Sequence, residues 1–256
     1  MKFSILTSYY VDNDIREKQL KRTVGSVLNQ TEADFEYILC DDGSPKRQEF
    51  PDDKRIVKVE GPHLERVVSL NRGLDIAKGD WIVFIDADDE LLSYALEAMS
   101  QMIDNYPDYK LFNYGSIHIH KDYVATIRGA FEPEQQDVGH VVFGGGNIVS
   151  GTFFFSRDCL EKYGGYPKEG RMWSPWDFSI SAQKEFPEIK PYFTVNDNPN
   201  HPPGTPKELG NPWGQDFYLF YKLTRYYHSK PFQIPLIIVH HEKGEAWGHE
   251  IKKEEA

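Results

Sequence analysis

The first half of the chain alternates short apolar segments with longer amphipathic ones. We expect strands over 3–8, 35–40, 55–59 and 81–85, and helices over 15–28, 66–77 and 91–103. Parallel neighbouring strands need a crossover element between them, and here each crossover has the pattern of a helix. The alternation therefore predicts the α/β class, with a mostly parallel central sheet flanked by helices.

Two acidic turns, "CDDGS" and "IDADDE", follow the second and the fourth expected strands. The later turn holds four carboxylates within five positions: Asp86, Asp88, Asp89 and Glu90. A solvated helix N-terminus would tolerate such a group, and a divalent cation would offset its repulsion. Ligands of parallel sheets bind beyond the carboxyl ends of the strands. Both turns fall at that edge, which favours the cation, either Mn²⁺ or Mg²⁺.

Net charge and apolar run lengths exclude several function classes. The formal net charge of -11 argues against nucleic-acid binding, which relies on basic surface. No apolar run approaches the roughly 20 residues of a transmembrane helix, and the apolar start is too short for a secretory signal. Cys40 and Cys159 lie in apolar surroundings and predict reduced thiols. We therefore expect a cytoplasmic protein, with peripheral membrane contact still open.

The second half is rich in aromatic residues, Pro and Gly. Its patterns predict strands over 111–119, 141–149, 189–195 and 232–240, helices over 177–184 and 217–227, and a loop over 196–206. We find no internal repeat, no low-complexity linker and no domain boundary. One domain over 1–256 is expected, with a charged tail at 250–256 that frays.

The motif Asp86-Ala87-Asp88 also begins phosphatases of the haloacid dehalogenase type, in which the first Asp is the nucleophile. Those enzymes normally carry the motif on their first strand, with a Gly-Asp metal site downstream. Here the motif follows the fourth expected strand, and Gly79-Asp80 precedes it. A non-catalytic protein that binds carbohydrate or nucleotide is a further alternative. A sugar nucleotidyltransferase is disfavoured because no Gly-rich loop with Arg or Lys follows the first strand.

Five segments in order resemble the inverting nucleotide-sugar glycosyltransferases of family 2. They are "SILTSYY", "SVLNQT", "FEYILCDDGS", "NRGLDIAKGDWIVFIDADD" and "SGTFFFSRDCLEKYGGYP". The resemblance covers roughly residues 3–185. It implies a single Rossmann-like GT-A domain, with a nucleotide-sugar-binding half at 1–105 and an acceptor-binding half at 106–249. The implied activity is sugar transfer from a nucleoside diphosphate to the hydroxyl of a carbohydrate or glycolipid acceptor.

The same resemblance implies the donor site. The segment Thr7, Ser8 and Tyr9 would hold the base. Asp42, with Asp41 beside it, would accept a hydrogen bond from the uracil imide, which favours a UDP-sugar. The ordinary alternative for "DDGSP" is a turn.

In the later acidic turn, the resemblance implies that Asp86 contacts the ribose and that Asp88 binds the metal ion, with Asp89 as a second contributor. Many members have an Arg immediately before the residue that matches Asn71, and here that position is Leu70. Arg66 and Arg72 are the candidates to replace it at the diphosphate.

An inverting transferase needs a carboxylate that deprotonates the acceptor hydroxyl. The family places it after a turn that matches 164–167, which indicates Asp177, and Asp216 is the alternative. Either could instead be an ordinary helix N-cap.

The family often uses a late His as a further metal ligand. His201 is the candidate, and His240 and His241 are the alternatives. Aromatic faces suit sugar C–H faces, and core packing is the ordinary alternative for each such ring. The expected acceptor residues are Trp173, Trp176 and Trp213.

Overall fold

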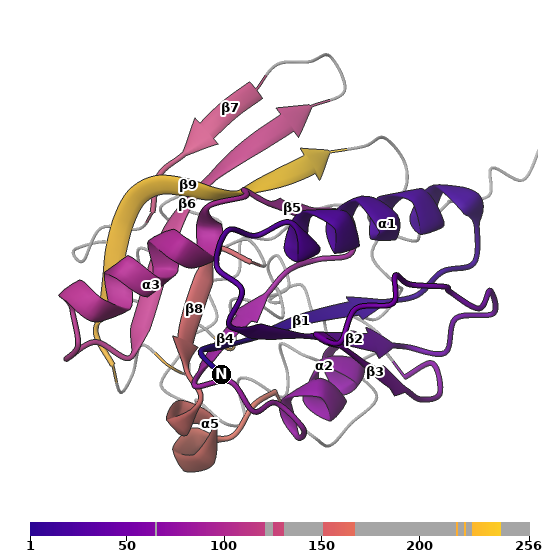
Figure 1. Ribbon diagram of the computed structural model, residues 1–256, viewed down its shortest axis with the longest axis horizontal. Coiled ribbons are helices and arrows are strands. Elements are labelled where there is room, and N and C mark those ends of the chain that lie inside the picture. Colours follow the sequence, from indigo (N-terminus) through magenta and orange to yellow (C-terminus); the bar gives the residue numbers. More distant parts are fainter. Residues whose placement is uncertain are drawn as a thin grey trace, which may run out of the picture.

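The computed structural model describes residues 1–64, 66–120, 125–130, 151–166, 219, 223 and 227–241. Within these residues, nine strands form one sheet in the order β3-β2-β1-β4-β8-β6-β9-β5, and β7 pairs with β6 (Figure 1). The strands are β1 (Phe3–Tyr9), β2 (Phe35–Asp41), β3 (Ile56–Glu60), β4 (Trp81–Phe84), β5 (Glu90–Leu91), β6 (Leu111–His120), β7 (Ala125–Arg128), β8 (Phe153–Ser156) and β9 (Ser229–His241).

The first four strands are parallel neighbours, as the alternating pattern predicts. The described helices are α1 (Asp14–Leu28), α2 (Arg66–Leu74), α3 (Ala95–Asn105) and α5 (Asp158–Tyr163). The α/β class is confirmed. The third expected helix begins at Ala95 instead of Leu91, because Glu90 and Leu91 pair with β9 as the short strand β5.

Helices cover both faces of the sheet (Figure 1). Neighbouring side chains of a strand point to opposite faces. Ile5 of β1 belongs to the apolar cluster that includes residues of α1 and α3, whereas Leu6 belongs to the cluster that includes residues of α2 and α5. Because both faces of β1 are covered, Phe3, Ile5 and Leu6 are fully buried, and so are the polar residues Ser4 and Thr7.

Strand β8 connects the two halves of the sheet. It pairs antiparallel with β4 on one side and with β6 on the other. Phe154 of β8 is fully buried and stacks on Phe112 of β6, with ring centroids 4.9 Å apart. Trp81 of β4 packs edge-on against Phe154 at 5.6 Å. Aromatic packing therefore spans the junction.

In the described part of the chain, no helix is long and apolar enough to cross a membrane.

We predict that Phe154→Ala lowers the free energy of unfolding by about 3–5 kcal/mol, because it leaves a cavity between β4 and β6. Urea denaturation followed by circular dichroism measures this change. The control is Ile127→Ala on β7, where the side chain is 71% exposed and the loss should be small. Equal losses in the two variants would contradict this account of the junction.

Candidate functional site

The two acidic turns lie at the same edge of the sheet. The parallel register pairs Tyr9 of β1 with Asp41 of β2, and Leu6 of β1 with Phe84 of β4. The carboxyl ends of β1, β2 and β4 therefore point the same way, and each turn begins where its strand ends. This is the edge at which α/β sheets bind ligands.

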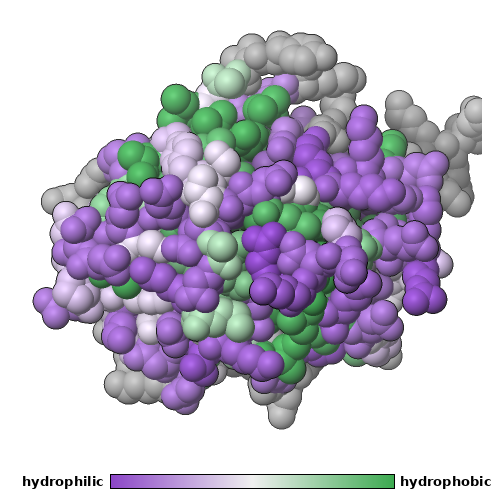
Figure 2. Space-filling view, viewed as in Figure 1, coloured by the Kyte–Doolittle hydropathy of each residue, from purple (hydrophilic) through white to green (hydrophobic). Residues whose placement is uncertain are grey.

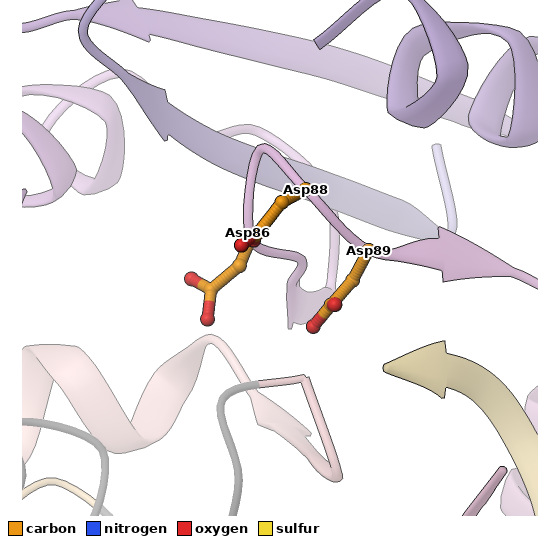
Figure 3. A group of neighbouring side chains, drawn as sticks. All are labelled: Asp86, Asp88 and Asp89. Carbon is orange, nitrogen blue, oxygen red and sulfur yellow. The ribbon is translucent and has the colours of Figure 1, made fainter. Parts of the chain in front are cut away.

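Three carboxylates gather in the turn after β4. One oxygen each from Asp86, Asp88 and Asp89 lies within 4.8 Å of the others. Figure 3 shows the carboxylates of Asp86 and Asp89 pointing to the same side of the loop. We call these three residues the acidic triad. Hard divalent cations bind carboxylate oxygens at about 2.0–2.6 Å, so a triad of this spacing can surround one ion.

Burial makes the charge of the triad costly. It raises the pKa of Asp88 to about 6, with the negative charge of Asp86 as the second cause. Burial also raises the pKa of Asp89 well above its usual range, and the charges of Asp86 and Asp88 add to the effect. A bound cation would favour the ionised carboxylates and reverse these shifts. The donor set and its charge thus fit a divalent metal ion.

Helix α1 holds the backbone of this loop from the side. Arg22 donates from Nη2 to the carbonyl oxygen of Asp88 at 2.6 Å, and the hydroxyl of Thr23 donates to the carbonyl of Asp89 at 2.7 Å. Neither residue was expected from the sequence. Thr23 is fully buried, on the face of α1 that also buries Leu20, Val24 and Val27. A buried hydroxyl needs a hydrogen-bond partner. A Thr among the apolar positions of the expected helix was therefore the sequence signal that could have indicated this contact.

Strand β9 supports the loop from the other side. The backbone N–H of His240 donates to Oδ1 of Asp89 at 3.1 Å, and its ring Nε2 lies 2.7 Å from Oε1 of Glu90. His241 instead contacts Nδ1 of His118 at 2.8 Å. Of the two alternative histidine ligands, His240 therefore lies beside the triad, with its ring directed to Glu90. Their role as ligands stays a prediction.

The two candidate arginines of α2 face different acids. Arg66 contacts Oδ1 of Asp86 through Nη2 at 2.7 Å and through Nε at 3.1 Å. Arg72 instead lies 3.4 Å from Oδ1 of Asp42. Leu70 is buried in the core. Arg66 is therefore the candidate that the fold brings to the acidic triad.

Asp42 is nearly enclosed at the end of β2. Its side chain is 4% exposed. It accepts hydrogen bonds from the backbone N–H of Leu64 at 3.1 Å and from the ring of His63 at 2.7 Å. Asp41 has a different role here, since its Oδ1 accepts from the N–H of Ser44 at 2.8 Å and closes the turn.

The other expected donor residues lie in or near the core. Thr7 is buried and bonds the hydroxyl of Tyr37, and the hydroxyl of Ser8 bonds that of Ser69. Tyr9 is buried, and burial raises the pKa of its hydroxyl. Contacts of these residues with a base stay predictions.

Asn71 joins helix α2 to the segment that follows α5. Its amide nitrogen donates to the carbonyl of Tyr166 at 3.0 Å, and its carbonyl accepts from the N–H of Tyr166 at 3.1 Å. Asn71 therefore fixes α2 against the segment that follows α5, and its contact with a donor stays a prediction. The remaining expected site residues lie outside the described residues: Asp177, Asp216, His201, Trp173, Trp176 and Trp213.

Comparison with known proteins gives a family and a fold. The model of "Glycosyl transferase family 2" matches residues 4–164. A PGL/p-HBAD biosynthesis glycosyltransferase of Mycobacterium bovis is 30% identical over 174 residues, which are 63% of each chain. The Escherichia coli protein UDP-Glc:alpha-D-GlcNAc-diphosphoundecaprenol beta-1,3-glucosyltransferase WfgD is 31% identical over 112 residues, which are 40% of this chain and 44% of that protein.

The chain therefore spans less than two thirds of these curated relatives. Among solved structures, S. aureus TarS 1-349 in complex with UDP has a TM-score of 0.55 at 14% identity. That match covers 94% of this chain and 61% of TarS 1-349. This structural similarity shows that the two chains share a fold.

The raised pKa of Asp88 predicts a pH-dependent stability. Its carboxyl group titrates at about 6 in the folded protein and at about 3.8 when unperturbed. The folded state therefore binds more protons in this window, and stability falls as the pH rises through it. Without divalent ions, Asp88→Asn should raise the midpoint of thermal unfolding at about pH 8 and change it little near about pH 4.

The control is Asp104→Asn, whose side chain is 70% exposed and pairs with Lys2 at the surface. Differential scanning fluorimetry at the two pH values gives both comparisons. A midpoint for Asp88→Asn that shifts equally at both pH values would contradict the assigned burial of this charge.

Proposed function

Because the chain belongs to glycosyl transferase family 2, we propose that it transfers a sugar from a nucleoside diphosphate to an acceptor hydroxyl. The acidic triad at the carboxyl edge of the sheet carries this proposal. UDP is the favoured carrier. In support, the Escherichia coli relative is named for UDP-Glc, and S. aureus TarS has been solved with UDP.

The triad suits Mn²⁺ or Mg²⁺. Asp88 and Asp89 would hold the ion, and His201 is the proposed further ligand, with His240 and His241 as alternatives. When bound, such an ion would neutralise charge on the departing diphosphate. Arg66 lies beside the triad at Asp86, where a diphosphate oxygen can take over one of its hydrogen bonds.

The nucleoside is assigned to the adjoining turn. Asp42 would accept the N–H of the uracil ring, and Asp86 would contact the ribose. The segment Thr7, Ser8 and Tyr9 would hold the base. This segment ends beside the turn, since the backbone N–H of Asp42 donates to the carbonyl oxygen of Tyr9 at 2.9 Å. An ionised carboxylate only accepts hydrogen bonds, so Asp42 favours a base with a ring N–H.

The transfer itself needs a base on the acceptor side. The acceptor oxygen bonds to the anomeric carbon while the bond from that carbon to the diphosphate oxygen breaks, and a carboxylate takes the hydroxyl proton. We assign this carboxylate to Asp177, with Asp216 as the alternative. Attack opposite the leaving group inverts the anomeric centre. The proposed acceptor surface includes Trp173, Trp176 and Trp213.

A carbohydrate or glycolipid is the proposed acceptor. In support, the name of the Escherichia coli relative includes a sugar carried on diphosphoundecaprenol. The non-catalytic alternative, a protein that only binds carbohydrate or nucleotide, would show neither turnover of a sugar nucleotide nor a metal requirement. A screen of sugar nucleotides for metal-dependent thermal shifts separates the two and identifies the donor.

We predict that UDP binds with Mn²⁺ and that Asp88→Ala removes this dependence. Calorimetric titration should show wild-type affinity falling by roughly tenfold or more with EDTA, because losses around a metal site reach this size. Asp88→Ala should bind equally weakly under both conditions. Asp104→Asn at the surface serves as the control and should behave as wild type. If EDTA leaves the affinity of the wild type for UDP unchanged, the metal role is refuted.

A second prediction concerns the base. Asp177→Asn should keep UDP affinity and lower turnover by roughly 10²–10⁴-fold, the usual contribution of a general base. Asp216→Asn should cost far less. Initial rates with the donor found in the screen provide the measurement. If the two variants show the reverse order, Asp216 is the base.

A further inference from the structure

The imidazole of His63 lies against the carboxylate of Asp42, where it donates a hydrogen bond. Its Nδ1 lies 2.7 Å from Oδ2 of that carboxylate and 3.0 Å from the backbone carbonyl oxygen of the same residue. Both partners are acceptors, so Nδ1 carries the proton and donates. Asp42 therefore already receives an N–H from a planar ring, which is the contact that a uracil imide would make.

Tyr10 provides the matching aromatic face. Its ring stacks on that of His63, with centroids 4.3 Å apart and an interplanar angle of 25°. Aromatic stacking of this kind and a charge-assisted hydrogen bond are what a nucleobase needs from a protein. Imidazole thus makes two base-like contacts at one place.

The backbone of His63 is packed closely, whereas its side chain borders the solvent. A Cβ atom on Gly43 would lie 2.5 Å from the backbone nitrogen of His63, and Gly43 has a φ of +77°. This glycine therefore lets the turn after β2 approach the segment after β3. The side chain of His63 is 49% exposed, against 4% for Asp42. Rotation of the imidazole into solvent would remove the His63 contact from Oδ2 of Asp42, whereas the N–H of Leu64 and Arg72 would keep their contacts with Oδ1.

We propose that His63 takes the place of the nucleobase in the donor-free protein, so that a donor has to displace its imidazole from Asp42 and Tyr10. This inference rests on the proposed function, because it places the base at Asp42. While His63 occupies Asp42, only a fraction of the molecules has Asp42 open to the base. The apparent affinity for the donor is reduced in proportion to that fraction. A base with a ring N–H, such as uracil, replaces the lost hydrogen bond, whereas cytosine presents an acceptor nitrogen to the carboxylate.

The test compares wild type, His63→Ala and the control His228→Ala, a change of an exposed histidine before β9. Calorimetry with Mn²⁺ measures the binding of UDP, CDP and inorganic pyrophosphate. We expect His63→Ala to bind UDP about tenfold more tightly, the size of one charge-assisted hydrogen bond. Pyrophosphate affinity should not change, because it has no base. CDP should bind more weakly than UDP in every variant.

A direct observation accompanies the titration. In protein labelled with isotopic histidine, the Nδ1–H signal of His63 is assigned by its absence from His63→Ala. We expect UDP to shift this signal to that of a solvent-exposed imidazole, and pyrophosphate to leave it unchanged. A thermal melt of His63→Ala confirms that the variant is folded.

Two failures are distinguishable. The displacement is refuted if UDP binds wild type at least as tightly as it binds His63→Ala. It is also refuted if UDP leaves the Nδ1–H signal in place. In both cases the assignment of the donor site stands. If neither protein binds UDP, the proposed function fails and this inference fails with it. An equal gain for pyrophosphate in His63→Ala would also refute it, because the effect would then not concern the base.

Discussion

The cost of burying negative charge at the end of β4 is the constraint on which the site depends. Burial is the main cause of the raised pKa values of Asp88 and Asp89. A carboxylate oxygen of each lies within 4.8 Å of a carboxylate oxygen of Asp86. Such a group is stable only with positive or hydrogen-bonding partners. Helix α1 holds the loop through the backbone carbonyls of Asp88 and Asp89, and β9 donates the backbone N–H of His240 to Oδ1 of Asp89. These contacts fix the position of the triad, and Arg66 offsets part of its negative charge at Asp86.

Positive charge is divided between the two acidic turns. Arg66 faces Asp86 and Arg72 faces Asp42, although both arginines come from helix α2. Figure 2 shows a largely hydrophilic surface on one face of the molecule, and the chain has a net charge of -11. In so acidic a protein, a phosphorylated ligand needs local cations. One helix thus supplies a cation to each turn, and the metal ion we propose would supply the rest.

Much of the first half could be predicted because its signals are local. Strand β4 is apolar where it is buried, and the acids follow it directly. The supporting residues could not be predicted in this way. Thr23 meets Asp89 across 66 positions, and His63 meets Asp42 across 21. Such contacts depend on strand register and on how a helix packs, which periodicity does not encode.

The sequence by itself determined the α/β class, the succession of the first strands and helices along the chain, and the position of both acidic turns, because periodicity and turn residues act over a few positions. Only the tertiary structure decided which acids gather and which groups face them. It separated Asp41, which closes its own turn, from Asp42, which is enclosed by distant residues. It also distinguished Arg66 from Arg72. The physical reason is that hydrogen bonds and charge interactions act across space, and folding brings together residues that are far apart in the chain.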